Sequence, residues 1–353
     1  MRSVIIVGLS SVLLAGVAGS SADEVAEIEG APTDENGRFT NLNGELSHGT
    51  LGVRMAFFLR RIGSSLSGRS GAPSVTPNDG LFLRENARHS TPTVTWIGHA
   101  TLLVQMEHLS FLTDPIWSKR PSPVRWIGPN RFVEPGLSIN QLPEIDFVVI
   151  SHNHYDHLDL PTLRRLAQRS PATKFFVPLG NAKLLRDNGI EQVEELDWGE
   201  TVRVAGVTIH CLPAQHWSKR RLGDDNKSLW SSWAIAGADR RFYFAGDTGY
   251  FQGFAEIGEK LGPFDLAAVP IGAYQPAAMM RESHMNPEQA IQAAVNLQAQ
   301  RALAIHYGTF NLSDERLDEP PRRFRLAAEQ AELLGDMGSE HAWIFNIGET
   351  RKF

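Results

Sequence analysis

The residues best suited to chemistry are the histidines and aspartates that follow the apolar segment 147–151. His152, His154, Asp156 and His157 fall within six positions. A buried strand rarely ends in such a cluster for packing alone, because each imidazole or carboxylate removed from water needs a partner. In an extended loop, His152 and His154 can face one metal ion, whereas Asp156 and His157 project elsewhere and can face a second. The spacing predicts a metal site.

Three more candidate ligands follow apolar segments further along the chain. His216 comes after the segment 207–212, Asp247 after 242–244, and His306 directly after 302–305. Each is weak evidence alone, because a histidine after a strand is more often an ordinary surface or core residue. Together with the first cluster they complete a set of seven. We expect one ion on His152, His154 and His216, a second on Asp156, His157 and His306, and Asp247 as a bridge between them.

The elements that must position these side chains are short strands alternating with helices. Apolar runs rich in β-branched and aromatic residues predict strands at 94–97, 101–105, 110–113, 147–150, 175–177, 207–209, 233–235, 242–244, 266–269, 302–305 and 342–345. Amphipathic spacing predicts helices at 160–168, 254–261, 287–297 and 324–334. The early strands form hairpins and the later ones alternate with helices, which indicates an α/β fold with mixed sheets.

Composition excludes several classes of protein. The 353 residues include 34 Lys and Arg against 40 Asp and Glu, a formal net charge of −6, so nonspecific nucleic-acid binding is not expected. The single cysteine, Cys211, excludes an internal disulfide and a cysteine-rich zinc site. It lies within a predicted strand, where an inert buried thiol is the default. The 12 histidines are therefore the informative residues.

The candidate ligands lie within longer blocks that resemble a known family. The order of His152 to His157, His216, Asp247 and His306 resembles the metallo-β-lactamase superfamily of binuclear hydrolases. The blocks look like the N-acyl phosphatidylethanolamine-hydrolysing phospholipase D family; they are WIGHAT (96–101), FLTDP (111–115), ISHNHYDHLD (150–159), QHWSKR (215–220), FAGDTGY (244–250), GPFDLAA (262–268), PIGAY (270–274) and AIHYGTF (304–310). The resemblance spans about residues 93–310, with a weaker tail to 348, and leaves 1–90 uncovered.

The resemblance implies a four-layer αβ/βα sandwich with the site at the strand ends between two sheets. It implies two zinc ions, a phospholipid substrate, and hydrolysis of N-acyl phosphatidylethanolamine to an N-acylethanolamine and phosphatidic acid. Two ions can acidify a bridging water and stabilise charge on a phosphoryl group. The expected nucleophile is thus a metal-bridging hydroxide held by Asp247 and oriented by Asp156, and no serine or cysteine nucleophile is required.

Other residues receive roles of less weight. By resemblance, His284 meets the substrate head group, where it binds phosphate or protonates the leaving oxygen. A loop histidine without any role in the site explains His284 equally well. Tyr155 matches a substrate-contacting position, with ordinary packing as the alternative. Residues 219–221 (Lys-Arg-Arg) either attract a phosphate or form a solvated basic turn. Asp114 is expected to orient a ligand histidine, and His99 to do likewise. No role is assigned to the remaining histidines, which are His48, His89, His108, His210 and His341.

The N-terminal part divides into two segments before the hydrolase domain, which we place at 91–353. Residues 1–22 combine Arg2, an apolar run and small residues before Asp23, which predicts a signal peptide and an exported protein; an uncleaved membrane anchor is the alternative. Residues 23–90 form a poorly patterned arm. Within it, 53–62 predicts either an amphipathic helix that touches a bilayer or a helix that caps the domain. We expect membrane association and leave a homodimer open.

Two other functions stay open at this point. The first is another reaction of the superfamily, on a lactone, a β-lactam or a different phosphodiester. The second is a noncatalytic metal-binding scaffold that keeps the fold; degenerate members usually lose ligands, and all seven are present here.

Overall fold

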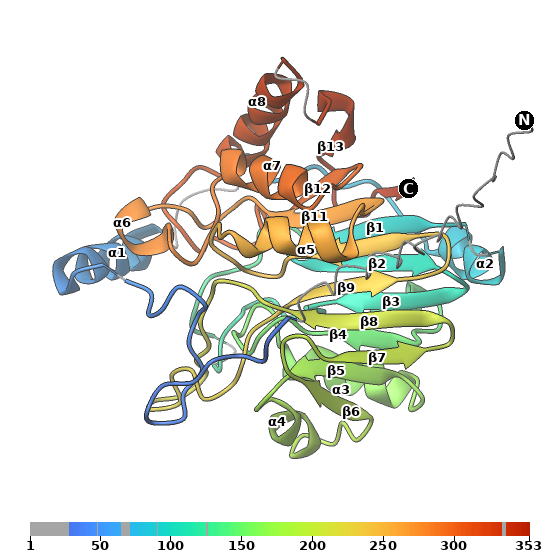
Figure 1. The fold of residues 1–353 in the computed structure, drawn as a ribbon, viewed down its shortest axis with the longest axis horizontal. Helices are drawn as coiled ribbons and strands as arrows, with labels where there is room; N and C mark the ends of the chain where they lie inside the picture. The colour runs from blue at the N-terminus through green and yellow to red at the C-terminus, as the bar shows by residue number, and fades with distance from the viewer. Residues whose placement is uncertain (1–27, 48, 65–70, 90, 125, 334–336) are drawn as a thin grey trace, which may run out of the picture.

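Two seven-stranded sheets face each other across an apolar interior (Figure 1). The computed structural model describes residues 28–47, 49–64, 71–89, 91–124, 126–333 and 337–353. The first sheet has the order β14-β1-β2-β3-β4-β5-β6 and the second β13-β12-β11-β10-β9-β8-β7. The predicted signal peptide lies outside the described residues.

Both sheets are mixed, as the sequence predicts. In the first, β1, β2, β3 and β14 pair antiparallel, whereas β3 to β6 pair parallel. In the second, β7 to β10 pair antiparallel and β10 to β13 pair parallel. The strands of the first sheet are β1 (Thr93–Gly98), β2 (Thr101–Met106), β3 (Leu109–Thr113), β4 (Phe147–Val149), β5 (Lys174–Pro178), β6 (Val193–Leu196) and β14 (Thr350–Lys352). Those of the second are β7 (Thr201–Val204), β8 (Val207–Leu212), β9 (Ser232–Ala236), β10 (Arg241–Phe244), β11 (Leu266–Pro270), β12 (Ala302–Ile305) and β13 (Ala342–Trp343).

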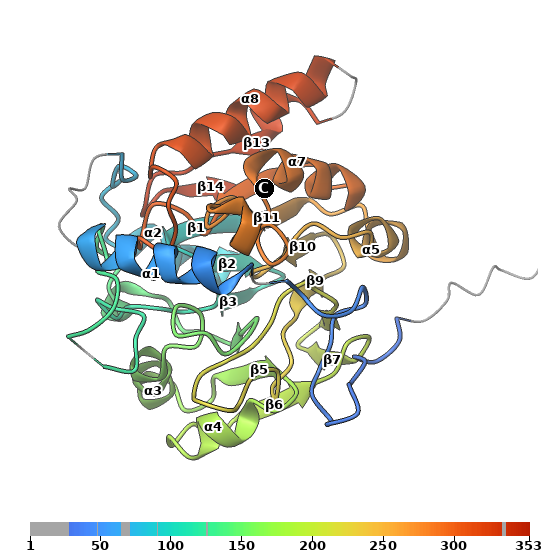
Figure 2. The same ribbon diagram turned by 90° about the vertical axis from the view of Figure 1, so that its left-hand side faces the viewer.

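Helices cover the outer face of each sheet, which completes the αβ/βα sandwich (Figures 1 and 2). Leucines of α2, α3 and α4 pack on the outside of the first sheet, and apolar residues of α5, α7 and α8 join the core of the second. The helices are α1 (Leu51–Ser64), α2 (Leu81–His89), α3 (Leu160–Arg169), α4 (Ala182–Arg186), α5 (Gly253–Leu261), α6 (Ala277–Met280), α7 (Pro287–Asn296) and α8 (Glu319–Leu333), with 3-10 turns at Ile139–Gln141 and Ser339–His341.

Successive side chains of β4 pack in two different layers of the fold. Phe147 and Val149 face the interior between the sheets, whereas Val148 belongs to the cluster under the outer helices. Because successive side chains of a strand point to opposite faces, a strand buried on both sides is apolar throughout. This explains why residues 147–150, ahead of Ser151 and His152, include no polar side chain.

The strands that the sequence analysis missed all lie at sheet edges. Strands β6, β7 and β14 are short, and their Glu194, Glu195, Arg203 and Lys352 are charged. Charged edge strands resist pairing with other chains, and the same charges hide them from a search for apolar runs. The strand predicted at 342–345 is shorter in the structure, where it forms β13. The helix predicted from residue 324 begins earlier, at Glu319. Pro320 and Pro321 fit in its first turn, because N–H groups there have no partner within the helix.

The arm before residue 91 packs on the two sheets. In α2, Leu83 is fully buried and the Asn86 side chain donates a hydrogen bond to Gln105 of β2 (Nδ2 to Oε1, 3.1 Å). The amphipathic helix expected at 53–62 falls within α1, which contacts α6. Within the described ranges, no helix combines the length and the apolar character needed to cross a membrane.

We predict that Phe147→Ala destabilises the protein by about 3–5 kcal/mol, because it leaves a cavity between the sheets. The Phe147 ring stacks on Phe111 with centroids 4.6 Å apart and lies just before the cluster of candidate ligands. Urea unfolding should show a lower midpoint with an unchanged slope. The control is Leu326→Ala on α8, where the side chain is 48% exposed and the expected change is within about 0.5 kcal/mol. Equal midpoints for the two variants would contradict this assignment of the core.

Candidate metal centre

All seven predicted ligands meet at one end of the two sheets. The loop after β4 supplies His152, His154, Asp156 and His157, while the segments after β8, β10 and β12 supply His216, Asp247 and His306. Polar groups at the carboxyl ends of parallel strands share one edge of a sheet, and the two sheets here present these edges to each other. The structure therefore brings together every ligand candidate of the sequence.

One group contains three histidines. The ring nitrogens of His152, His154 and His216 lie within 4.8 Å of one another. His154 Nδ1 is 2.8 Å from His152 Nε2 and 3.3 Å from His216 Nε2. His154 Nδ1 offers either one lone pair or one proton, so it cannot make a good hydrogen bond to both neighbouring nitrogens at once. A cation shared by the three rings satisfies this group better than hydrogen bonds do.

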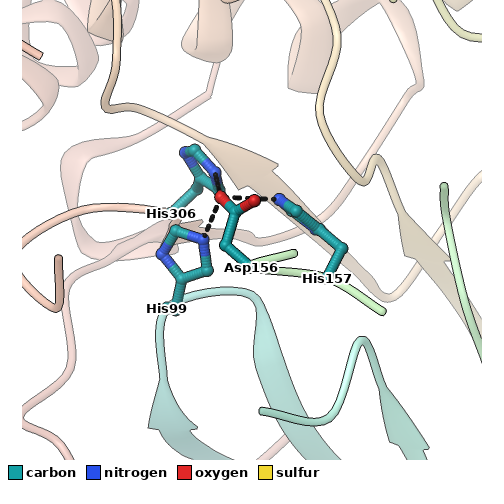
Figure 3. Close-up of side chains that lie close together, drawn as sticks. All are labelled: His99, Asp156, His157 and His306. Atoms are coloured by element: carbon teal, nitrogen blue, oxygen red, sulfur yellow. Dashed lines mark hydrogen bonds and ion pairs between the residues drawn. The ribbon is translucent and has the colours of Figure 1, made fainter. Parts of the chain in front are cut away.

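The second group is drawn in Figure 3. Asp156 Oδ2 lies 3.0 Å from His99 Nε2, 3.4 Å from His157 Nε2 and 3.6 Å from His306 Nε2. The three imidazoles and the carboxylate point toward a common centre. The sequence analysis gave His99 the role of an orienting residue. In the structure, His99 contacts Asp156 of this group directly.

Asp247 lies between the two groups. Its Oδ2 is 3.2 Å from His157 Nε2 and 3.9 Å from His216 Nε2, and its Oδ1 is 3.0 Å from His306 Nε2. One carboxylate therefore faces imidazoles of both groups, which is the geometry that a bridging ligand requires.

The chemistry of the donor set fits metal ions. Among the described residues, several buried ligand atoms make no hydrogen bond: His157 Nε2, His306 Nε2 and Asp247 Oδ1. Leaving such polar atoms buried without a partner costs about 1–3 kcal/mol each. All of them point into the centre, so divalent cations would satisfy them together.

Hydrogen bonds on the far side of the rings fix how two of the ligands point. His157 Nδ1 is 2.6 Å from Asp114 Oδ2, and Ser151 donates its backbone N–H to Asp114 Oδ1 at 2.7 Å. His216 Nδ1 donates to the carbonyl oxygen of Ser283 at 3.0 Å. The bonds to Asp114 and to the Ser283 carbonyl each use Nδ1 of a ring and leave its Nε2 free for a cation. Asp114 has the neighbour that the sequence analysis expected, whereas the Ser283 carbonyl carries no sequence signal.

The arm supplies a contact that sequence reasoning missed. Asn41 is buried, donates from Nδ2 to the His216 carbonyl oxygen at 2.9 Å and accepts from the His216 N–H at 2.9 Å. Its Oδ1 also accepts from the Trp230 indole at 3.1 Å. These bonds hold the backbone of a candidate ligand across 175 positions of sequence, so no local pattern could have revealed them.

The backbone itself is strained at the site. His99, Asp114 and His306 have positive φ angles of 55°, 34° and 59°. Left-handed backbone costs roughly 1–3 kcal/mol at a non-glycine residue and persists only where the surroundings enforce it. Here it turns the chain sharply after a strand, which directs His99 and His306 into the centre and Asp114 against the far side of the His157 ring.

Burial and neighbouring charges divide the histidines into two sets. Burial lowers the pKa of His154 to about 4 and holds that of His152 well below its usual value. Burial opposes charge at His306 as well, but the carboxylates of Asp247 and Asp156 outweigh it and raise the pKa of His306 to about 9. Cations entering this centre would have to displace such protons.

The space in front of the ligands is a pocket of about 140 Å³. His284 lines it, with Nδ1 3.9 Å from Asp247 Oδ2, and burial lowers the pKa of His284 to about 4. Tyr155 lies instead on a neighbouring cavity, where its hydroxyl donates to the Arg220 carbonyl oxygen at 2.9 Å. Of the two predicted substrate residues, the structure places only His284 on the metal pocket.

The other residues named from sequence lie outside this centre. Lys219 pairs with Asp225 at 2.6 Å, and Cys211 is buried, which raises the pKa of its thiol. Among the described residues, the groups that could hold a metal ion do not include His89, His108, His210 or His341. His48 lies outside the described residues.

Comparison with known proteins identifies relatives of this arrangement. A family model described as "Beta-lactamase superfamily domain" matches residues 110–307. An N-acyl-phosphatidylethanolamine-hydrolyzing phospholipase D of Caenorhabditis elegans is 45% identical over 253 residues, which are 69% of this chain and 71% of that protein. The mitochondrial enzyme of the same description from Saccharomyces cerevisiae is 35% identical, over 70% of this chain and 54% of its own. The structure of a metallo hydrolase from Ignicoccus hospitalis superposes with a TM-score of 0.56 over 75% of this chain and 99% of that one, at 24% identity, and supports the fold.

We predict that Asn41→Ala weakens metal binding about 10- to 100-fold, the usual range for residues that orient a ligand. Removing the amide leaves the backbone groups of His216 without their partners and loosens that ligand. Competition with a chromophoric chelator measures the affinity. The matched control is Asn43→Ala, two residues away in the same arm, whose exposed side chain contacts Gln215 and not His216. Similar affinities for the two variants would show that Asn41 does not position the ligand.

Proposed function

The chain belongs to the N-acyl-phosphatidylethanolamine-hydrolysing phospholipase D family of the metallo-β-lactamase superfamily, and from this premise we propose that it is a binuclear zinc phosphodiesterase acting on N-acyl phosphatidylethanolamine. Fold and relatives together make it a metal-dependent hydrolase. Asp247 between two imidazole groups is the observation that carries the binuclear proposal. The products would be an N-acylethanolamine and phosphatidic acid.

Each proposed ion has a complete set of ligands. His152, His154 and His216 would hold one ion. Asp156, His157 and His306 would hold the other, and Asp247 would touch both. When bound, two such ions lower the pKa of a water molecule to generate the nucleophile and stabilise negative charge on the phosphoryl group.

The protein's own residues would then orient the reactants. Asp247 and Asp156 are acceptors at the centre, and the pKa of each is held below its usual range because the charges of neighbouring histidines outweigh burial. These carboxylates can therefore hold and orient the attacking water. His284 is neutral at pH 7, so its ring N–H suits a hydrogen bond to a phosphoryl oxygen better than proton delivery to the leaving group.

A phospholipid substrate implies contact with a membrane surface, and α1 has features that support it. Leu51, Met55 and Leu59 are 74%, 52% and 64% exposed and recur every fourth residue, on one side of the helix. Helix α1 contacts α6, whose Met279 and Met280 line the metal pocket, and Figure 2 shows α1 lying across this end of the molecule. Amphipathic helices of this kind bind the bilayer interface. Export from the cytoplasm stays a proposal from the apolar segment that follows Arg2, and a homodimer stays open.

We predict two equivalents of zinc per chain, with Asp247→Asn losing more than about 100-fold of kcat/KM, because it removes a carboxylate charge that faces both proposed sites. Elemental analysis gives the stoichiometry, and turnover is measured before and after chelation and after zinc is returned. Asp239→Asn, an exposed aspartate on another loop, is the control and should keep full turnover. A near-normal rate for Asp247→Asn would refute the bridging role.

The substrate class is tested with a panel of N-acyl phosphatidylethanolamine, phosphatidylcholine, a lactone and a β-lactam. We expect the highest kcat/KM for the N-acylated phospholipid, because a phosphodiester presents its charge to both proposed ions. Preference for the lactone or the β-lactam would sink the phospholipase proposal and support another reaction of the superfamily. Bound zinc with no hydrolysis of any compound would support a noncatalytic scaffold.

A further inference from the structure

A second cavity, of about 600 Å³, lies between the loop 118–123, the start of α3 and the end of α4. It is lined by five cationic side chains and one carboxylate. The cations are Lys119, Arg120, Arg164, Arg220 and Arg221, and the carboxylate is Asp159. A volume of this size accommodates an organic ligand.

The five cations outnumber the acids beside this basic cavity, which are Asp159 and Asp224. The carboxylate of Asp159 is buried and already accepts from the Ser118 hydroxyl at 2.8 Å and the Thr162 hydroxyl at 2.6 Å. That of Asp224 accepts from the backbone N–H groups of Arg220 and Arg221. Within the described part of the chain, no ion pair joins any of the five cations to a carboxylate.

Neutral groups hold two of the arginines in place. Arg220 donates from one nitrogen to the carbonyl oxygens of Asn153 at 2.8 Å and Leu158 at 2.9 Å, and its guanidinium stacks over the Tyr155 ring at 4.1 Å. Arg120 donates to the Gly128 carbonyl oxygen. Guanidinium groups fixed in this way keep further N–H donors for an anion, and planar donors match the oxygens of phosphate.

Exposed apolar side chains lie close in sequence to these cations. Trp126 and Ile127 follow Lys119 and Arg120 and are 77% and 60% exposed, while Leu222 follows Arg221 and is 97% exposed. Leu222 also lines an open groove that shares Tyr155, Arg220 and Arg221 with the basic cavity and Trp217 with the metal pocket. Basic side chains beside exposed tryptophan and leucine are what a membrane surface rich in anionic lipid attracts.

We propose that the basic cavity binds the phosphate group of an anionic phospholipid, at a site separate from the metal centre. The cations would compensate the phosphate charge while Trp126, Ile127 and Leu222 enter the bilayer around it. Such a lipid would hold the neighbouring groove and the metal pocket against the membrane. This binding needs no turnover and does not depend on the proposed reaction.

The test is vesicle sedimentation of the zinc-loaded full chain. Vesicles contain phosphatidylcholine alone or with one-fifth phosphatidic acid. We expect tighter binding to the second kind, and a loss of that added affinity on the order of 10- to 100-fold in the triple variant Lys119→Gln, Arg164→Gln, Arg221→Gln. The matched control replaces one lysine and two arginines that are exposed elsewhere, Lys352→Gln, Arg203→Gln and Arg325→Gln, and should stay within about 3-fold of the unmodified protein.

A second arm distinguishes the lipid from soluble phosphate. The variant Trp126→Ala, Leu222→Ser keeps the cations and should lose vesicle binding, and inorganic phosphate alone should bind far more weakly than the vesicles. The proposal is overturned if both triple variants bind equally, if phosphatidylcholine alone binds as well, or if inorganic phosphate occupies the site and the apolar variant binds vesicles normally. Thermal unfolding confirms that each variant is folded. Because the assay measures no hydrolysis, its failure leaves the proposed reaction untouched.

Discussion

The structure depends on one constraint: imidazole and carboxylate groups are buried together at the ends of two sheets, away from water. Their mutual contacts are only 2.8–3.9 Å long, and several ligand atoms find no hydrogen bond in the described residues. Cations bound in the centre would replace the missing solvent and partners and so stabilise such a collection. The apolar interior between the sheets provides the rigid support that holds these groups close despite their mutual repulsion.

The surroundings of the centre are built to keep the rings from turning. Asp114 and the Ser283 carbonyl engage one nitrogen of a ring, and left-handed backbone at His99 and His306 directs others inward. Asn41 extends this support into the arm. The segment before residue 91 therefore contributes to the geometry of the centre as well as to its cover, although it lies outside the 110–307 match to the superfamily model.

Three adjoining hollows with different linings lie on the open side of the centre. The pocket at the ligands is small and holds His284 and two methionines, the groove beyond Trp217 is broad, and the cavity past Tyr155 is basic. Helix α1 and the loop tips at Trp126 and Leu222 carry exposed apolar side chains, which the proposed membrane contact would use.

The sequence by itself determined what depends on neighbours along the chain. Apolar runs located the buried strands, and the helix predicted from residue 287 is α7, where the Asn286 side chain accepts from the Gln289 N–H at 2.8 Å. Spacing also placed every ligand candidate at a strand end. Only the tertiary structure decided the rest. The charged edge strands, the hold of Asn41 on His216 across 175 positions and the cavity shared by Lys119, Arg164 and Arg220 have no local pattern. The physical reason is that these contacts join segments far apart in the chain, so they exist only once the core has brought those segments together.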